Sequence, residues 1–148
     1  MPQASGLQFT ATIGEYSSDH FSVVGFALTE RLSELFQGRL DLASTDPSVV
    51  ASKVLEQPVD LVIWQDRAPL RRFTGVVSEF ARGDSGHRRT RYELVFRPPL
   101  WRLALMHNSR IFQNRGTDEI VRTLLEERGV VDTVFDLERR PEEREYCV

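Results

Sequence analysis

The first half of the chain carries the hydrophobic alternation of half-buried β-strands. In Leu7–Ile13, apolar residues alternate with glutamine and threonine, and this two-residue period predicts a strand with one face toward a core. Phe21–Leu28 and Arg39–Ala43 have similar patterns, so both are expected to be strands. Gly38 precedes the third segment and is expected at a turn or bulge.

A short helix is expected after these strands. Asp46 is a suitable cap, and Pro47 suits the first helical position, where no backbone N–H is needed. Pro58 would end the helix, because proline cannot continue it. The buried stripe of this helix would consist of four apolar residues, Val49, Val50, Val54 and Leu55.

The middle of the chain predicts a buried strand followed by a hairpin. Leu61–Trp64 is a compact apolar run, and the turn-forming segment Asp66–Pro69 follows it. Arg72–Arg82 and Thr90–Phe96 are expected to pair with each other. The tip of this hairpin is expected at Gly83-Asp84-Ser85-Gly86, because these residues tolerate turn conformations.

Apolar and charged side chains alternate along the return strand of this hairpin. The expected inward set is Tyr92, Leu94 and Phe96, and the expected outward set is Arg91, Glu93 and Arg97. Pro98-Pro99 should end the strand, since proline has no N–H to donate. Leu100–Met106 is expected to form a short helical turn.

A helix is the clearest element of the remaining sequence. Thr117 is predicted to cap it, and Gly129 is predicted to close it. Asp118 and Glu119 lie at its positive end, where carboxylates are stabilising. Its buried stripe would consist of Ile120, Val121, Leu124 and Leu125.

The carboxyl-terminal part predicts one strand and a tail. Val130–Leu137 is expected to be a strand, and residues 138–148 are expected to be a charged, solvated tail. The whole pattern indicates a mainly β fold of the α+β class, antiparallel and carrying two or three short helices. At 148 residues the chain fits one domain comfortably.

Composition narrows the function classes. The net charge is -3, from 19 basic and 22 acidic side chains, so no global field attracts nucleic acid or anionic lipid. Cys147 is the one cysteine and cannot form an internal disulfide. Met1–Gly6 lack the basic and apolar regions of a secretory signal. No apolar run reaches the roughly 20 residues that span a bilayer, so the chain is expected to be made in the cytosol.

One local motif resembles a catalytic sequence. Gly83-Asp84-Ser85-Gly86 matches the nucleophile loop of trypsin-like proteases, and His20 and Asp60 precede it in a permissible order. However, His87 and Arg88 stand where that loop continues with glycine and proline, and the chain is too short for two barrels. A hairpin tip explains the motif, and a small hydrolase using Ser85 and His87 is kept as the less favoured alternative.

Metal and acid–base chemistry find no support in the sequence. The histidines, His20, His87 and His107, are widely separated, and no cysteine or histidine pair has metal-ligand spacing. Glu126-Glu127 and Glu142-Glu143 are expected to be solvated. The sequence therefore predicts no enzyme, no catalytic, metal or cofactor-binding residue, and no cofactor.

A small cluster of basic residues invites a nucleic-acid interpretation. Arg88, Arg89 and Arg91 could neutralise phosphates while Tyr92 stacks on a base. The cluster lies on one hairpin of an acidic chain, so an exposed charged sheet face is expected instead, and a contact with another protein is the next alternative.

Several segments together resemble the VgrG family of type VI secretion spike proteins and the related Rhs-element Vgr proteins. They are Phe21–Leu28, Leu32–Phe36, Leu40–Ser44, Phe73–Val77, Tyr92–Trp101, Ser109–Gln113, Glu119–Gly129 and Arg144–Val148. The Arg-Ile-Phe-Gln run at Arg110–Gln113 and the Arg-Glu-Tyr-Cys run at Arg144–Cys147 are the more specific of these. Pro99 departs from the tryptophan of the family pattern.

The resemblance implies an antiparallel, barrel-like domain similar to the baseplate hub of phage tails. Residues 1–148 would be the amino-terminal fragment of the hub-like domain of a longer protein, since family members continue past the motif that ends at Val148. Full-length members form trimers, seat on the tube of Hcp rings, contact baseplate components and carry effectors out when the sheath contracts. They are assembled in the cytoplasm and leave without a signal peptide.

The resemblance supplies no catalytic residue and no mapped interface residue. The signature residues Phe73, Tyr92, Trp101 and Phe112 are expected to pack in the core. The isolated chain is expected to expose apolar surface that a longer protein covers, and to be a monomer or a weak oligomer without stable membrane insertion. A phage or prophage tail hub and an Rhs-associated carrier are the alternatives with the same fold.

Overall fold

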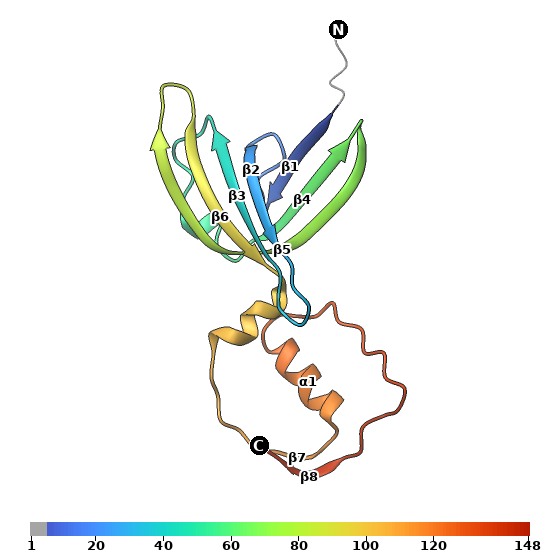
Figure 1. Ribbon diagram of the computed structural model, residues 1–148. Coiled ribbons are helices and arrows are strands. Elements are labelled where there is room, and N and C mark those ends of the chain that lie inside the picture. The colour runs from blue at the N-terminus through green and yellow to red at the C-terminus, as the bar shows by residue number, and fades with distance from the viewer. Residues whose placement is uncertain (1–5) are drawn as a thin grey trace. The chain divides into compact units, whose positions relative to one another are not determined.

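Six antiparallel strands curl into one half-barrel sheet in the first of two compact units (Figure 1). The computed structural model describes residues 6–148. The strands are β1 (Leu7–Ile13), β2 (Ser22–Thr29), β3 (Gln37–Ser44), β4 (Pro58–Gln65), β5 (Ala68–Ser85) and β6 (Thr90–Arg97). Their order in the sheet is β1-β4-β5-β6-β3-β2. The expected antiparallel, barrel-like fold is confirmed.

The core lies on the inner face of this sheet. Alternation along each strand directs one set of side chains inward, and the register pairs Leu40 with Leu94 and Leu61 with Phe73. At the two sheet edges the rings of Phe9 on β1 and Phe26 on β2 meet edge-on, with centroids 5.1 Å apart. The fully buried side chains include Ile13, Phe21, Leu40, Leu42, Leu61, Val77, Tyr92, Leu94 and Phe96.

Two elements of the first unit differ from the sequence prediction. Gly38 is a buried residue of strand β3 and does not lie in a turn. Glycine is needed there because the ring of Phe96 occupies the space that a side chain would fill. The helix expected after Asp46 is reduced to one 3-10 turn, η1 (Ala51–Lys53). Pro58 begins strand β4 and does not end a helix.

The β5–β6 hairpin is confirmed, but its tip lies further along the chain than predicted. Gly83, Asp84 and Ser85 belong to β5, and the connecting turn is residues 86–89. The amide of Gly86 donates to the carbonyl of Arg89 at 2.9 Å and closes this turn. The turn after β4, at Asp66 and Arg67, is confirmed, and both residues have positive φ.

A second unit comprises Pro99–Val148, where one domain was expected for the whole chain. The proline pair ends β6, as predicted, and with it the sheet. The elements of this unit are the 3-10 helix η2 (Pro99–Leu105), β7 (Phe112–Arg115), α1 (Thr117–Glu126) and β8 (Arg144–Cys147). β7 and β8 form a separate two-stranded antiparallel sheet.

Helix α1 confirms most of the predicted helix. Gly116, and not Thr117, is the N-cap, and Gly129 closes the carboxyl end with φ +68°. Ile120 and Leu125 are buried, whereas Val121 is exposed.

The chain after α1 differs from the prediction. Val130–Leu137 has no regular structure, so the expected strand is wrong. Within the expected tail, Arg144–Cys147 form β8, which pairs with a strand about 30 residues earlier. The expectation about a secretory signal rests mostly on residues 1–5, which lie outside the described residues.

Candidate functional site

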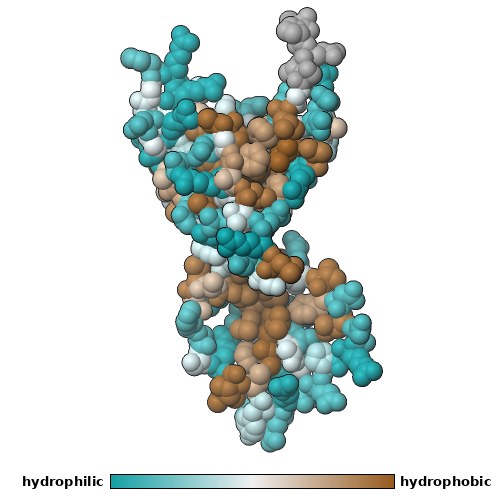
Figure 2. Space-filling view, in the orientation of Figure 1, coloured by the Kyte–Doolittle hydropathy of each residue, from teal (hydrophilic) through white to brown (hydrophobic). Residues whose placement is uncertain are grey.

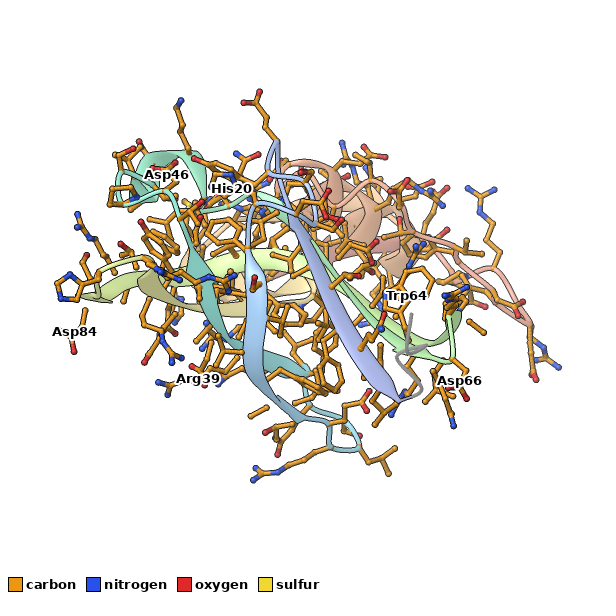
Figure 3. The ribbon with its side chains drawn as sticks, turned by 90° about the horizontal axis from the view of Figure 1, so that it is seen from above. His20, Arg39, Asp46, Trp64, Asp66 and Asp84 are labelled. Carbon is orange, nitrogen blue, oxygen red and sulfur yellow. The ribbon has the colours of Figure 1, made fainter. Side chains whose placement is uncertain are left out.

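The structure separates the residues of the suspected catalytic motif. The hydroxyl of Ser85 lies 3.1 Å from that of Thr90 and accepts a hydrogen bond from Arg82 at 3.0 Å. His20 lies against Asp46, with 3.7 Å between Nε2 and a carboxylate oxygen (Figure 3). Asp60 is paired with Arg72 at 3.3 Å. Each group therefore has a different partner from the one that nucleophilic catalysis requires.

His20 belongs to an aromatic corner beside the core. Its ring centroid lies 4.4 Å from that of Tyr16 and 4.7 Å from that of Phe21. The hydroxyl of Tyr92 donates to the backbone carbonyl of Asp46 at 2.7 Å. These contacts fix the loop after β3 against the core, which is a structural role.

Asp46 shapes the same loop. Its carboxylate accepts hydrogen bonds from the amide and hydroxyl of Ser48, at 2.8 and 2.6 Å. These hydrogen bonds favour the charged form and hold the pKa of Asp46 below its usual value. Asp46 therefore accepts hydrogen bonds as a helix cap would, but these hydrogen bonds close a turn and do not begin a helix.

The other candidate groups are dispersed. Within residues 6–148, no group of three or more His, Cys, Asp or Glu side chains is placed to hold a metal ion. His87 and His107 are exposed, as are the acid pairs Glu126-Glu127 and Glu142-Glu143. Over the same residues, no helix has the length and apolar character needed to cross a membrane.

The suspected nucleic-acid cluster lacks its aromatic partner. Tyr92 is 0% exposed and points inward, so it cannot stack on a base. Arg88, Arg89 and Arg91 are exposed at the end of the β5–β6 hairpin. Arg89 donates to the hydroxyl of Ser22 at 3.1 Å. The expected charged sheet face is present.

Ion pairs and hydrogen bonds connect β3, β6 and β5 on the outer face of the sheet. Arg39 on β3 pairs with Glu93 on β6 and lies 3.9 Å from Asp41. Arg97 on β6 pairs with Glu79 on β5 at 3.0 Å and also donates to Gln37 and Ser78. Sequence reasoning placed Arg91, Glu93 and Arg97 on this face but missed the partners of Glu93 and Arg97, because side-chain pairing between strands is not visible in one sequence.

The signature residues divide between core and half-exposed positions. Phe73 and Tyr92 are buried, which confirms the expectation of core packing for these two. Trp101 and Phe112 are only half-buried. The guanidinium of Arg110 lies over the ring of Phe112 at 5.7 Å, so part of the specific Arg-Ile-Phe-Gln segment packs on itself.

Arg110 also pairs with Glu127 at the end of α1. The two side chains are 2.8 Å apart, and the hydrogen bond lowers the pKa of Glu127 and raises that of Arg110. This pair ties the segment before β7 to the end of the helix. The two residues are 17 positions apart in the sequence, so helical periodicity does not predict this pair.

The second unit exposes many large apolar side chains (Figure 2). Val134 is 94% exposed, Val131 68% and Ile111 64%. Isolated exposed apolar residues are ordinary, but a concentration of them is typical of surfaces that bind protein, membrane or ligand. The exposed set in this unit also includes Leu100, Leu105, Met106, Leu137 and Tyr146.

Comparisons with known proteins identify relatives. Residues 29–148 match the model of the family described as the phage tail baseplate hub. Over 142 residues the chain is 44% identical to the type VI secretion system spike proteins VgrG2b and VgrG2a of Pseudomonas aeruginosa. Both matches include 96% of this chain but only 14% and 17% of those proteins.

Solved structures share the fold. A type VI secretion component of Escherichia coli, described as similar to the bacteriophage T4 tail proteins gp27 and gp5, superimposes with a TM-score of 0.67. It is 24% identical, and the match covers 99% of this chain and 37% of that one. A prophage tail protein of Shewanella oneidensis superimposes with a TM-score of 0.59 at 12% identity. This match covers 96% of this chain and 43% of the prophage protein.

Proposed function

The chain belongs to the phage tail baseplate hub family, and we propose that it forms the hub-like, amino-terminal region of a longer VgrG-type spike of a type VI secretion system. The observation that carries this proposal is the 44% identity to two spike proteins over 96% of the chain. In the full-length protein this region trimerises, seats on the Hcp tube and contacts the baseplate. The assembled spike leaves the cytoplasm with its effectors when the sheath contracts.

The proposed contribution of this region is mechanical and not catalytic. Dense backbone pairing in a six-stranded sheet and a core of large apolar side chains resist local opening. The different partners of Ser85, His20 and Asp60 support this reading over a serine hydrolase. One relative is named an actin cross-linking toxin, and the match includes only 10% of that protein. An activity of such a relative therefore need not reside in the matched region.

The exposed apolar residues of the second unit support a place within a larger assembly. Val134 and Ile111 are among the residues that a longer chain or a neighbouring copy would cover. Stable association usually buries about 800 Å² per partner. This region alone is expected to offer less interface area than that, so the isolated chain is expected to be a monomer or a weak oligomer.

A phage or prophage tail hub, or an Rhs-associated carrier, has the same fold and is the second candidate. The tail proteins of Shewanella oneidensis and Neisseria meningitidis have this fold at 12% and 13% identity. The identity to the type VI spike proteins VgrG2b and VgrG2a is 44%. That difference favours the spike.

A hub exchange in a working secretion system tests the proposal. The homologous segment of VgrG2a from Pseudomonas aeruginosa would be replaced by this chain, and the chimeric spike would be followed into the culture supernatant. The proposal predicts secretion that depends on sheath contraction. The control chimera carries Leu61→Asp, which places a charge in the core and should abolish secretion.

A chimera that accumulates as a folded protein in the cell, but does not reach the supernatant, would contradict the proposed role.

A further inference from the structure

The end of the β5–β6 hairpin is a charged projection. Every residue from 81 to 89 is exposed, and the hairpin extends beyond the neighbouring strands (Figure 1). Its end carries four arginines, Arg82, Arg88, Arg89 and Arg91, against one acid, Asp84. The local net charge is therefore +3 with His87 neutral, whereas the whole chain has -3.

Hydrogen bonds fix the shape of this projection. The amide of Gly86 donates to the carbonyl of Arg89 at 2.9 Å, and the hydroxyls of Ser85 and Thr90 are 3.1 Å apart. Arg89 donates to Ser22 on β2, which anchors the turn to another strand. A preorganised loop loses little conformational entropy when it binds.

Two of the arginines are available to a partner. The side chains of Arg82 and Arg89 are used within the unit, whereas the guanidinium groups of Arg88 and Arg91 form no hydrogen bond or ion pair with any residue from 6 to 148. A guanidinium group presents a planar fork of donors that matches a carboxylate bidentately. Both arginines are thus suited to carboxylates or phosphates.

A depression at the base of the projection decides between these two kinds of ligand. It has a volume of about 420 Å³, and Arg39, Asp41, Asp84, Arg91 and Glu93 line it. Of these lining residues, Asp84 lies near the end of the hairpin (Figure 3). Arg39 pairs with Glu93 and lies 3.9 Å from Asp41, so the three carboxylates of the lining exceed its two arginines by one negative charge. This excess disfavours a continuous phosphate backbone or an anionic membrane in the depression. Asp84, which forms no ion pair with any residue from 6 to 148, attracts a basic side chain.

We propose that the hairpin end and the depression form a docking surface for a polypeptide of mixed charge. Carboxylates of this partner bind Arg88 and Arg91, and a lysine or arginine of the partner enters the depression beside Asp84 and Asp41. Buried Tyr92 offers no stacking surface, which also disfavours nucleic acid. The inference goes beyond the hub role and does not require the oligomeric state proposed for it.

A titration followed by amide NMR tests this surface. The probe is a nine-residue synthetic peptide that alternates glutamate with glycine and carries one central lysine in place of a glutamate. We expect shifts of the amides of residues 82–91 at low ionic strength. Because reversing one exposed charge acts through an ion pair, Arg88→Glu should weaken binding about fivefold.

The matched control is Arg67→Glu. Arg67 is an exposed turn residue on the β4–β5 hairpin of the same unit, so the change in net charge is identical, and binding should change less than about twofold. The proposal is overturned if both variants weaken binding equally, or if no hairpin amide shifts. It is also overturned if a 12-base-pair DNA duplex binds the hairpin more tightly than the peptide. A chimera that is secreted normally while this titration fails would leave the spike role intact.

Discussion

At the scale of single residues, two glycines make room for one aromatic ring in the sheet. Gly38 on β3 lies opposite Phe96 on β6, and a Cβ at Gly38 would overlap that ring. Gly75 on β5 lies near the same ring: a Cβ there would lie 3.0 Å from Phe96 Cδ2 and 2.5 Å from the backbone oxygen of Arg97. Phe96 is fully buried, so these glycines serve packing and not turn formation.

This arrangement predicts a specific cost for a methyl group. Gly38→Ala should lower the free energy of unfolding by about 1–3 kcal/mol, because an overpacked core forces side chains out of their preferred conformations. Gly25→Ala is the matched control on β2, where the nearest atom to an added Cβ is an Asp41 oxygen at 3.5 Å. Urea unfolding of the two variants measures the difference. Equal stabilities would show that the Phe96 ring moves freely.

At the scale of elements, the local hydrophobic pattern of the sequence predicted most strands of the six-stranded sheet. Leu7–Ile13, Phe21–Leu28, Arg39–Ala43 and Thr90–Phe96 were predicted as strands from their alternation, whereas Leu61–Trp64 was predicted from its compact apolar run. The expected helix after Asp46 is limited to the single turn η1 (Ala51–Lys53), although Val49 and Val54 of its expected stripe are buried. Glu56 adopts φ +62°, which ends any helical path.

Pairing between distant segments was not predictable from local pattern. β7 and β8 are four residues each and are exposed along most of their length, so neither carries a hydrophobic period. The segment Val130–Leu137 has apolar residues but pairs with no strand. In the candidate surface, the sequence located the charges of the hairpin but not the depression, whose lining comes from three strands.

The Arg110–Glu127 pair predicts a pH dependence in the second unit. The pKa of Glu127 is lowered in the folded protein, so its contribution to stability is present above the unfolded value and is lost as pH falls through the folded value. Glu127→Gln should therefore reduce stability at neutral pH and have less effect in acid.

Carboxyl NMR titration of Glu127 provides the direct measurement. We expect its pKa to rise toward the ordinary value in Arg110→Gln, because the hydrogen bond that favours the charged form is lost. An unchanged titration in that variant would rule out Arg110 as the cause.

At the scale of the whole molecule, each unit has its own structure and the proposed work is mechanical. The first unit contains the large core and the six-stranded sheet, and the second has little regular structure beyond η2, α1 and one short strand pair. Central strands of a sheet open only when the whole sheet unfolds, whereas exposed irregular segments open locally. A load-bearing hub therefore requires that the first unit behave as one cooperative body.

Amide hydrogen exchange of the chain measures that cooperativity residue by residue. The account predicts that amides of β3 and β6, each flanked by strands on both sides, exchange together and at least about a hundredfold more slowly than those of Val130–Leu137. Exchange of β3 and β6 at the rate of the irregular segment would contradict it, because such a sheet could not transmit force.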